Sequence, residues 1–189
     1  MLGLHIYLPI HYITMSADNE RFLYPSADSS TCIECNLCEK VCLIIQIKPK
    51  TTNPNQRAFL VQHKNNKILR GSTSGGSFTA IAKWGLDKRG VVLGAGFNES
   101  FKVVHQSIYE YQELSKFRNS KYVQSKIHDT FIQVKQLLQE GKWVCFSETP
   151  YQLEGLISFL RKPYDKLITV DVVCRACPSP LVLRKYLEM

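Results

Sequence analysis

Cysteines are the residues of this 189-residue chain whose number and spacing most directly indicate chemistry. Four of the seven form a C-x2-C-x2-C-x3-C run, and these are Cys32, Cys35, Cys38 and Cys42. Because the two-residue spacing lets three thiolates converge on one iron–sulfide cube, bacterial ferredoxins use this spacing. The run therefore predicts a 4Fe-4S cluster as the metal site of the chain. A structural zinc ion is the alternative, although zinc sites usually use two separated cysteine pairs.

The protein ligands for such a cluster are incomplete. In two-cluster ferredoxins the fourth cysteine of a run binds the other cluster, and no cysteine precedes Cys32. Three outcomes stay open: Cys42 or a remote cysteine closes a single cluster, the cluster is three-coordinate and labile, or the site is vestigial. Cys174 and Cys177 have C-x2-C spacing, which suits a redox dithiol, half of a metal site or the completion of this cluster. His11 is a candidate substitute ligand.

Polar motifs further along the chain suggest a second site, for a phosphate-bearing ligand. The segment Ser72-Thr73-Ser74-Gly75-Gly76 precedes an expected helix, where glycines admit a ligand to the backbone and free amides bind phosphate. A serine N-cap beside a glycine turn is the alternative. The segment Asn119-Ser120-Lys121-Tyr122 joins a cation that can neutralise a pyrophosphate to an aromatic ring that can stack on a flavin. Its alternative is a surface turn.

Four other residues stand within or shortly after expected strands. Thr149 and Pro150 follow a buried strand, and ligands of open α/β sheets sit at strand ends. A proline in the first helical turn is equally good capping, and the neighbouring Glu148 would repel a phosphate. Asp171 lies inside an apolar strand and needs a partner there, either a flavin polar atom or a backbone amide. His105 is expected to be a core or edge residue, and no catalytic acid is identifiable.

Hydrophobic patterning predicts the elements that must position these residues. Residues 1–71 are expected to form an irregular, ferredoxin-like iron–sulfur segment and a basic connector, and residues 72–189 alternate helices with strands. Strands separated by helices of this size indicate an α/β domain with a mostly parallel sheet layered with helices. The expected helices are 77–86, 127–139, 152–160 and 181–189, and the expected strands are 91–97, 103–108, 143–146 and 167–173.

Composition excludes several classes of protein. Hydrophobic residues make up 44% of the chain and charged residues 21%, which is unlike a disordered chain or a coiled coil. The net charge of the chain is +8. The basic residues between 43 and 71 suit a solvated connector or a docking face for an anionic partner rather than a nucleic-acid site. No apolar stretch of about 18 residues predicts a membrane span. No signal peptide is recognisable, and crowded cysteines point to the reducing cytosol.

Several short stretches, taken in order, resemble the coenzyme F420 hydrogenase/dehydrogenase beta-subunit family. They are Ser74–Ala80, Gly90–Ala95, Val103–His105, Ser120–Ser125, Phe146–Pro150, Val170–Cys174 and Pro178–Pro180. The resemblance covers nearly the whole chain from about Ile13 onward. It implies a ferredoxin-like module that feeds an α/β domain binding FAD. Electrons would pass between the cluster and the flavin, and on to a deazaflavin or another acceptor.

Departures from the family pattern indicate a shortened and partly degenerate member. An earlier cysteine run is missing, and Leu8-Pro9 stands where its Cys-Pro would fall. The family's Thr-Pro-Cys is Thr149-Pro150-Tyr151 here, and Glu148 replaces the glycine before it. Asn119 replaces another glycine, and Arg175-Ala176 replaces a His-Gly pair. The family also continues beyond residue 189.

Two functions of different classes follow as expectations. The first is an iron–sulfur flavoprotein oxidoreductase subunit that passes electrons between a 4Fe-4S cluster and FAD. Its partners would be a redox protein or ferredoxin and a small-molecule acceptor such as coenzyme F420. The second is a non-catalytic remnant or interaction module with a structural or empty metal site. The expected cofactor-binding residues are Ser74, Gly75, Gly76, Ser120, Lys121, Tyr122, Thr149, Pro150 and Asp171.

Overall fold

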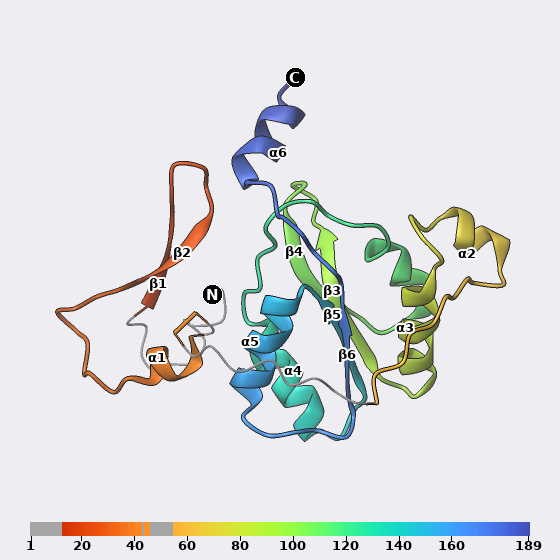
Figure 1. The fold of residues 1–189 in the computed structure, drawn as a ribbon, viewed down its shortest axis with the longest axis horizontal. Helices are drawn as coiled ribbons and strands as arrows, with labels where there is room; N and C mark the ends of the chain where they lie inside the picture. The colour runs from red at the N-terminus through yellow and green to blue at the C-terminus, as the bar shows by residue number, and fades with distance from the viewer. Residues whose placement is uncertain (1–12, 43, 46–54) are drawn as a thin grey trace.

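A four-stranded mixed sheet is the centre of the chain, in a computed structural model that describes residues 13–42, 44–45 and 55–189. The strand order is β4-β3-β5-β6 (Figure 1). The strands are β3 (Val91–Phe97), β4 (Val103–Ile108), β5 (Val144–Glu148) and β6 (Leu167–Asp171). The helices around them are α3 (Ser77–Asp87), η2 (Tyr111–Lys116), α4 (Thr130–Gln139), α5 (Pro150–Leu160) and α6 (Pro180–Leu187).

Helices cover both faces of the sheet, so the α/β class expected from the sequence is confirmed (Figure 1). Side chains of a strand alternate between faces. Val91 and Leu93 therefore pack with α4 and α5 on one face, whereas Val92 packs with α3 and η2 on the other. Burying β3 and β5 on both sides explains why these strands are continuous apolar runs rather than alternating ones.

The sheet is mostly but not wholly parallel, because the edge strand β4 runs antiparallel to β3. Residues 98–102 join these two strands, and a connection this short allows only a hairpin. The Asn98 side chain holds the turn, since its Oδ1 accepts from the Ser100 and Lys102 amides at 3.0 and 2.9 Å. The remaining pairings, β3 with β5 and β5 with β6, are parallel as expected.

Helix starts differ from the expected ones for local reasons. Helix α4 begins at Thr130 rather than residue 127, because His128 takes a left-handed conformation with φ 46°. Helix α5 begins earlier than expected, at Pro150, whose fixed φ suits the first helical position after the extended Thr149. Strand β6 ends at Asp171, two residues before its expected end.

The first part of the chain is more regular than expected. Strands β1 (Ile13–Ala17) and β2 (Leu23–Ala27) form an antiparallel hairpin, and helices α1 (Leu37–Val41) and α2 (Asn66–Arg70) follow. The hairpin lies beside the α/β part (Figure 1), where the Leu23 amide donates to Gln124 Oε1 at 3.0 Å. His11 and Leu8-Pro9 lie outside the described residues.

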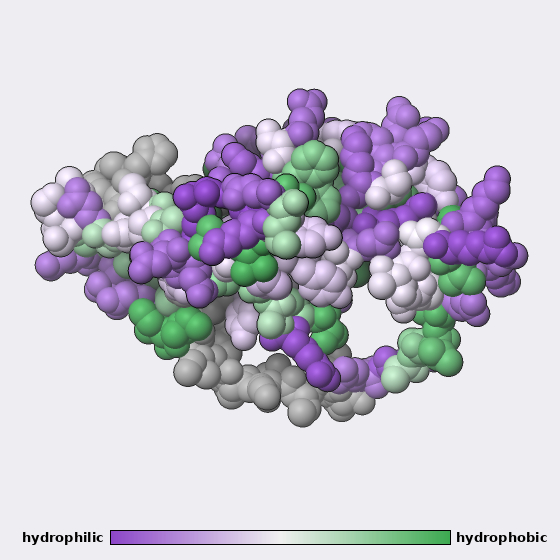
Figure 2. Space-filling model, turned by 90° about the horizontal axis from the view of Figure 1, so that it is seen from above, coloured by the Kyte–Doolittle hydropathy of each residue, from purple (hydrophilic) through white to green (hydrophobic). Residues whose placement is uncertain are grey.

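One face of the molecule is largely polar, as seen from above. Hydrophilic side chains cover most of the face seen from above, and apolar side chains gather there only in small groups (Figure 2). Among the described residues, no helix combines the length and the apolar character that crossing a bilayer requires.

Packing of α5 on the sheet generates a stability prediction. Leu156 is fully buried against the sheet, whereas the next residue, Ile157, is 47% exposed. We expect Leu156→Ala to lower the free energy of unfolding by about 2–5 kcal/mol, because it removes buried methyl groups and leaves a cavity. Chemical denaturation measures the loss, and Ile157→Ala is the matched control. Equal losses for the two variants would contradict this packing of α5.

Candidate functional site

A large cavity lies at the carboxyl ends of the parallel strands and has a volume of about 1380 Å³. Its walls include Gly94 and Ala95 of β3, Ser147 and Glu148 of β5, and Asp171 of β6. The chain leaves β3 for β4 on one side and returns to β5 on the other. Such a reversal of strand order opens the crevice in which open α/β sheets bind ligands.

Most of the cofactor-binding residues expected from the sequence line this cavity. They are Ser74, Gly76, Ser120, Lys121, Tyr122, Thr149 and Asp171. Gly75 and Pro150 do not line it. Gly75 instead packs tightly on the segment before α2, since its carbonyl accepts from the His63 amide at 2.7 Å and an added Cβ would lie 2.2 Å from the Val61 oxygen. The cofactor-binding role of all nine residues stays a prediction.

Hydrogen bonds between loops hold the motifs together. Asn119 Oδ1 accepts from both the amide and the hydroxyl of Thr73, at 3.0 and 2.8 Å. This joins the glycine loop before α3 to the segment that carries Lys121. Asn119 itself has φ 66°, a left-handed conformation that asparagine tolerates better than most residues. Asn119 is therefore compatible with this backbone conformation and adds a cross-loop contact.

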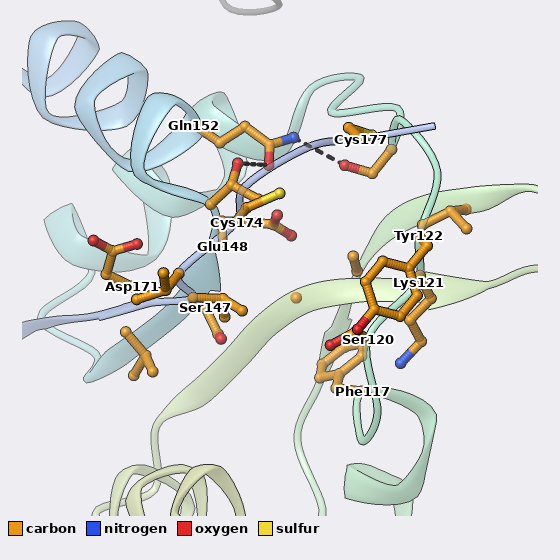
Figure 3. A pocket seen from close by; sticks show the side chains of 18 of the residues that line it. Phe117, Ser120, Lys121, Tyr122, Ser147, Glu148, Gln152, Asp171, Cys174 and Cys177 are labelled. Atoms are coloured by element: carbon orange, nitrogen blue, oxygen red, sulfur yellow. Dashed lines mark hydrogen bonds between the residues drawn. The ribbon is translucent and has the colours of Figure 1, made fainter. Parts of the chain in front are cut away.

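A second network orients the start of α5. Thr149 Oγ1 donates to Gln152 Oε1 at 2.6 Å, and Gln152 Nε2 donates to Ser125 Oγ at 2.9 Å. Figure 3 shows Gln152 on the same side of the cavity as Glu148 and Asp171, with Ser120, Lys121 and Tyr122 on the other. The two walls thus come from segments that are distant in sequence.

Lys121 supplies a cation with unusual properties. Its Nζ donates to the Arg118 carbonyl at 2.7 Å. Burial lowers the pKa of this lysine to about 8, against the opposing influence of the Glu148 charge. The ammonium therefore persists at neutral pH but is lost as the pH rises through about 8.

Glu148 and His105 form a buried pair that sequence reasoning missed. His105 Nε2 lies 2.5 Å from Glu148 Oε1, and the two side chains are 0% and 5% exposed. Neither atom makes a hydrogen bond among the described residues, and at this separation the two atoms would repel each other if neither carried a proton. His105 is buried, as expected, and stacks on Phe146 at 5.9 Å.

The cysteines divide into two groups. Cys42, Cys174 and Cys177 line the cavity, whereas Cys32 and Cys35 are exposed and Cys38 is half-buried. Across residues 13–42, 44–45 and 55–189, no three His, Cys, Asp or Glu side chains are gathered as metal ligands. The described arrangement therefore does not fit an assembled cluster, and the 4Fe-4S site stays a prediction.

Two thiols have shifted acidity. Burial and the neighbouring charge of Cys174 raise the pKa of Cys177. The two thiols of the C-x2-C pair are thus close enough to interact electrostatically. Burial alone raises the pKa of Cys145 to about 11. That residue is an inert core thiol, since the thiolate is the reactive form of cysteine.

Comparison with known proteins gives one informative result. No family model and no curated protein matches this chain. A chain of the F420-reducing [NiFe] hydrogenase complex from Methanosarcina barkeri, studied by xenon derivatization, matches with a TM-score of 0.55 at 16% identity. The match covers 74% of this chain and 52% of that one, so this chain spans about half of the neighbour's length. At this identity the likeness shows a shared fold.

The acidity of Lys121 is directly testable. We expect pulse acetylation followed by mass spectrometry to give Lys121 an apparent pKa of about 8. Glu148→Gln should lower that pKa further, because it removes the charge that favours the ammonium. The exposed Lys64 is the reference for reagent reactivity. An unchanged Lys121 profile in Glu148→Gln would contradict the electrostatic coupling.

Proposed function

We propose that this chain is an oxidoreductase subunit whose cavity binds FAD. One observation carries the proposal: four motifs separated in sequence, around Ser74, Lys121, Thr149 and Asp171, line a single cavity. The convergence supports a ligand site, because unrelated surface turns would have no reason to meet at the carboxyl edge of the sheet. The fold likeness to a chain of an F420-reducing hydrogenase complex supports redox chemistry.

The residues present fit a flavin dinucleotide. Drug-sized ligands occupy about 300–1,000 Å³, and the cavity of about 1380 Å³ is larger. The amino-terminal turn of α3 borders it through Gly76 and Ser77, where backbone amides favour phosphate. Lys121 adds a cation, and the exposed ring of Tyr122 offers a stacking surface. When bound, FAD would convert two-electron hydride chemistry into one-electron transfer.

The chain's own residues would bind and orient this cofactor. Lys121 would neutralise the pyrophosphate or an anionic ring, and its half-buried position strengthens that interaction relative to water. Asp171 would accept a hydrogen bond from a polar ring atom. The link between Thr73 and Asn119 would keep the phosphate loop and the lysine segment in register.

The electron partners are the finer part of the proposal. Cys42 lines the same cavity, which supports an electron carrier close to the flavin, namely the 4Fe-4S cluster expected from the cysteine run. A redox protein or ferredoxin would exchange electrons with it, and coenzyme F420 or a related small molecule would be the acceptor. The geometry supports the flavin site and does not by itself support the cluster, because the thiols are not gathered.

A specific observation favours the second candidate, a non-catalytic remnant or interaction module. Among the described residues, the four cysteines of the run range from exposed to buried rather than converging. Tyr151, which stands in the family's cysteine position, is 69% exposed and cannot be a thiolate ligand. Cofactor content separates the two candidates.

Flavin binding is the first test. We expect the full chain to bind FAD saturably, with flavin fluorescence as the measurement. Lys121→Met should weaken binding about tenfold, which corresponds to about 1.4 kcal/mol, because it removes the cavity cation. Lys64→Met is the matched control, since that lysine is exposed and outside the cavity. Equal affinities of the two variants would remove Lys121 from the site, and no saturable binding would reject the proposal.

Metal content is the second test. After anaerobic purification, we expect about four irons with matching sulfide per chain, the content of a 4Fe-4S cluster. Cys38→Ser should lose the iron, whereas Cys145→Ser should retain it because Cys145 lies in the core. One zinc without sulfide would establish the structural alternative. A folded chain with neither metal nor flavin would favour the remnant.

A further inference from the structure

The carboxyl of Glu148 is the one acidic group of the described cavity wall that is backed by a buried base. We propose that Glu148 exchanges a proton with the ligand of the cavity, and that His105 positions this carboxyl and neutralises it. Only the identity of the ligand in this inference rests on the proposed function. Glu148 would be the acid–base group of the cavity, which no sequence motif identified.

The pair forms across three strands. His105 of β4 is the register partner of Ala95 in β3. Gly94 of β3 is the partner of Ser147 in β5, so Ala95 and Glu148 are neighbours one position further along. All three side chains lie on the face that carries Phe146, on which His105 stacks. Because Ala95 is small, the imidazole reaches the carboxyl over the central strand.

The hydrogen bonds fix where the protons lie. A carbonyl only accepts, so the 3.2 Å contact between His105 Nδ1 and the Lys126 oxygen requires a proton on Nδ1. Nε2 and Glu148 Oε1 are buried 2.5 Å apart and have no hydrogen-bond partner among the described residues, so one further proton between them is what would satisfy both atoms. A doubly deprotonated pair would place two lone pairs 2.5 Å apart. The pair therefore holds at least this one shared proton.

Only Glu148 gives the pair access to a ligand. The His105 ring is fully buried and does not line the cavity, whereas Glu148 does (Figure 3). Since Oε1 faces His105, the second carboxylate oxygen is the one left for the cavity. The groups facing this carboxyl from neighbouring elements are Lys121, Asp171 as its register partner on β6, and the thiol of Cys174.

The chemistry defines the class of ligand. A ligand with an acidic ring N–H or O–H would place that group against Glu148 and its anionic part against Lys121. In the transfer, the ligand's N–H or O–H bond breaks and an O–H bond forms on Glu148. The pair then holds two protons instead of one, and the ligand keeps the electron pair of the broken bond. The reverse step returns the proton to the ligand. No oxidant or reductant is consumed.

Histidine nitrogen spectra of the full chain test the pair without any ligand. We expect His105 to carry its proton on Nδ1 in the unaltered protein. His63 should show the opposite tautomer, because its Nδ1 accepts from the Asn65 amide at 3.0 Å. Substitution of each histidine by glutamine assigns the signals. An unprotonated Nδ1 on His105 would overturn the pair, and this readout needs no variant of Glu148 to fold.

Two matched variants test the coupling between the residues. Glu148→Gln should shift the His105 Nε2 resonance, because it replaces the shared proton with an ordinary amide. Glu154→Gln should not, since Glu154 is exposed on α5. A His105 spectrum that is insensitive to Glu148→Gln would also overturn the proposal.

Proton exchange with the ligand is measured by titration calorimetry with FAD as the probe. Binding heats in two buffers of different ionisation enthalpy give the number of protons exchanged. We expect that number to differ by up to about one proton between the unaltered chain and Glu148→Gln, and to be unchanged in Glu154→Gln. FAD binding with the same proton count in Glu148→Gln would overturn the exchange role and leave the proposed function standing. No FAD binding by the unaltered chain would reject the proposed function and the exchange role, while the spectra still decide the pair.

Discussion

The small side chains at Gly94, Ala95 and Gly96 in the middle of β3 are the constraint on which the site depends. The start of this central strand, Val91–Leu93, fills the cores on both faces of the sheet. The three small residues follow before Phe97 ends the strand, and a Cβ on Gly94 would lie 3.3 Å from the Phe117 ring. The small residues therefore let η2 and its loop approach one face and let His105 meet Glu148 across the other. One strand thus supplies core at one end and cavity at the other.

The electrostatic properties of the cavity depend on which of its buried charged groups lie beside a partner. Glu148 is buried beside His105, whose Nε2 lies 2.5 Å from one carboxylate oxygen. Within the part of the chain that the structure describes, Lys121 has no ion-pair partner in direct contact and bonds a carbonyl instead. Burial therefore lowers its pKa to about 8, since a charge in a partly dry site loses hydration. Such perturbed groups in a cleft are typical of functional sites.

The structure supports the proposed role of the α/β part more firmly than that of the cysteine-bearing part. The cavity is built by strands and helices whose side chains pack to full burial, and the fold likeness to the hydrogenase-complex chain extends over 74% of this chain. The cysteine run lies around the short helix α1, and its thiols face different surroundings. An iron–sulfur cluster holds its own ligands together through metal–thiolate bonds. Binding of iron and sulfide therefore decides whether the cluster forms, and side-chain packing alone does not gather the thiols.

The sequence by itself determined the α-helices and strands from residue 77 onward, but not the short helix η2, because apolar runs and glycine boundaries report burial and turns locally. It also identified most cavity-lining motifs, since Lys121, Thr149 and Asp171 stand beside or within recognisable elements. It did not reveal the β1–β2 hairpin, whose strands carry few buried residues and so no strong pattern. Only the tertiary structure decided that β4 is antiparallel and that His105 meets Glu148. Residues 105 and 148 become neighbours through strand order, and that order results from long-range packing that no local pattern encodes.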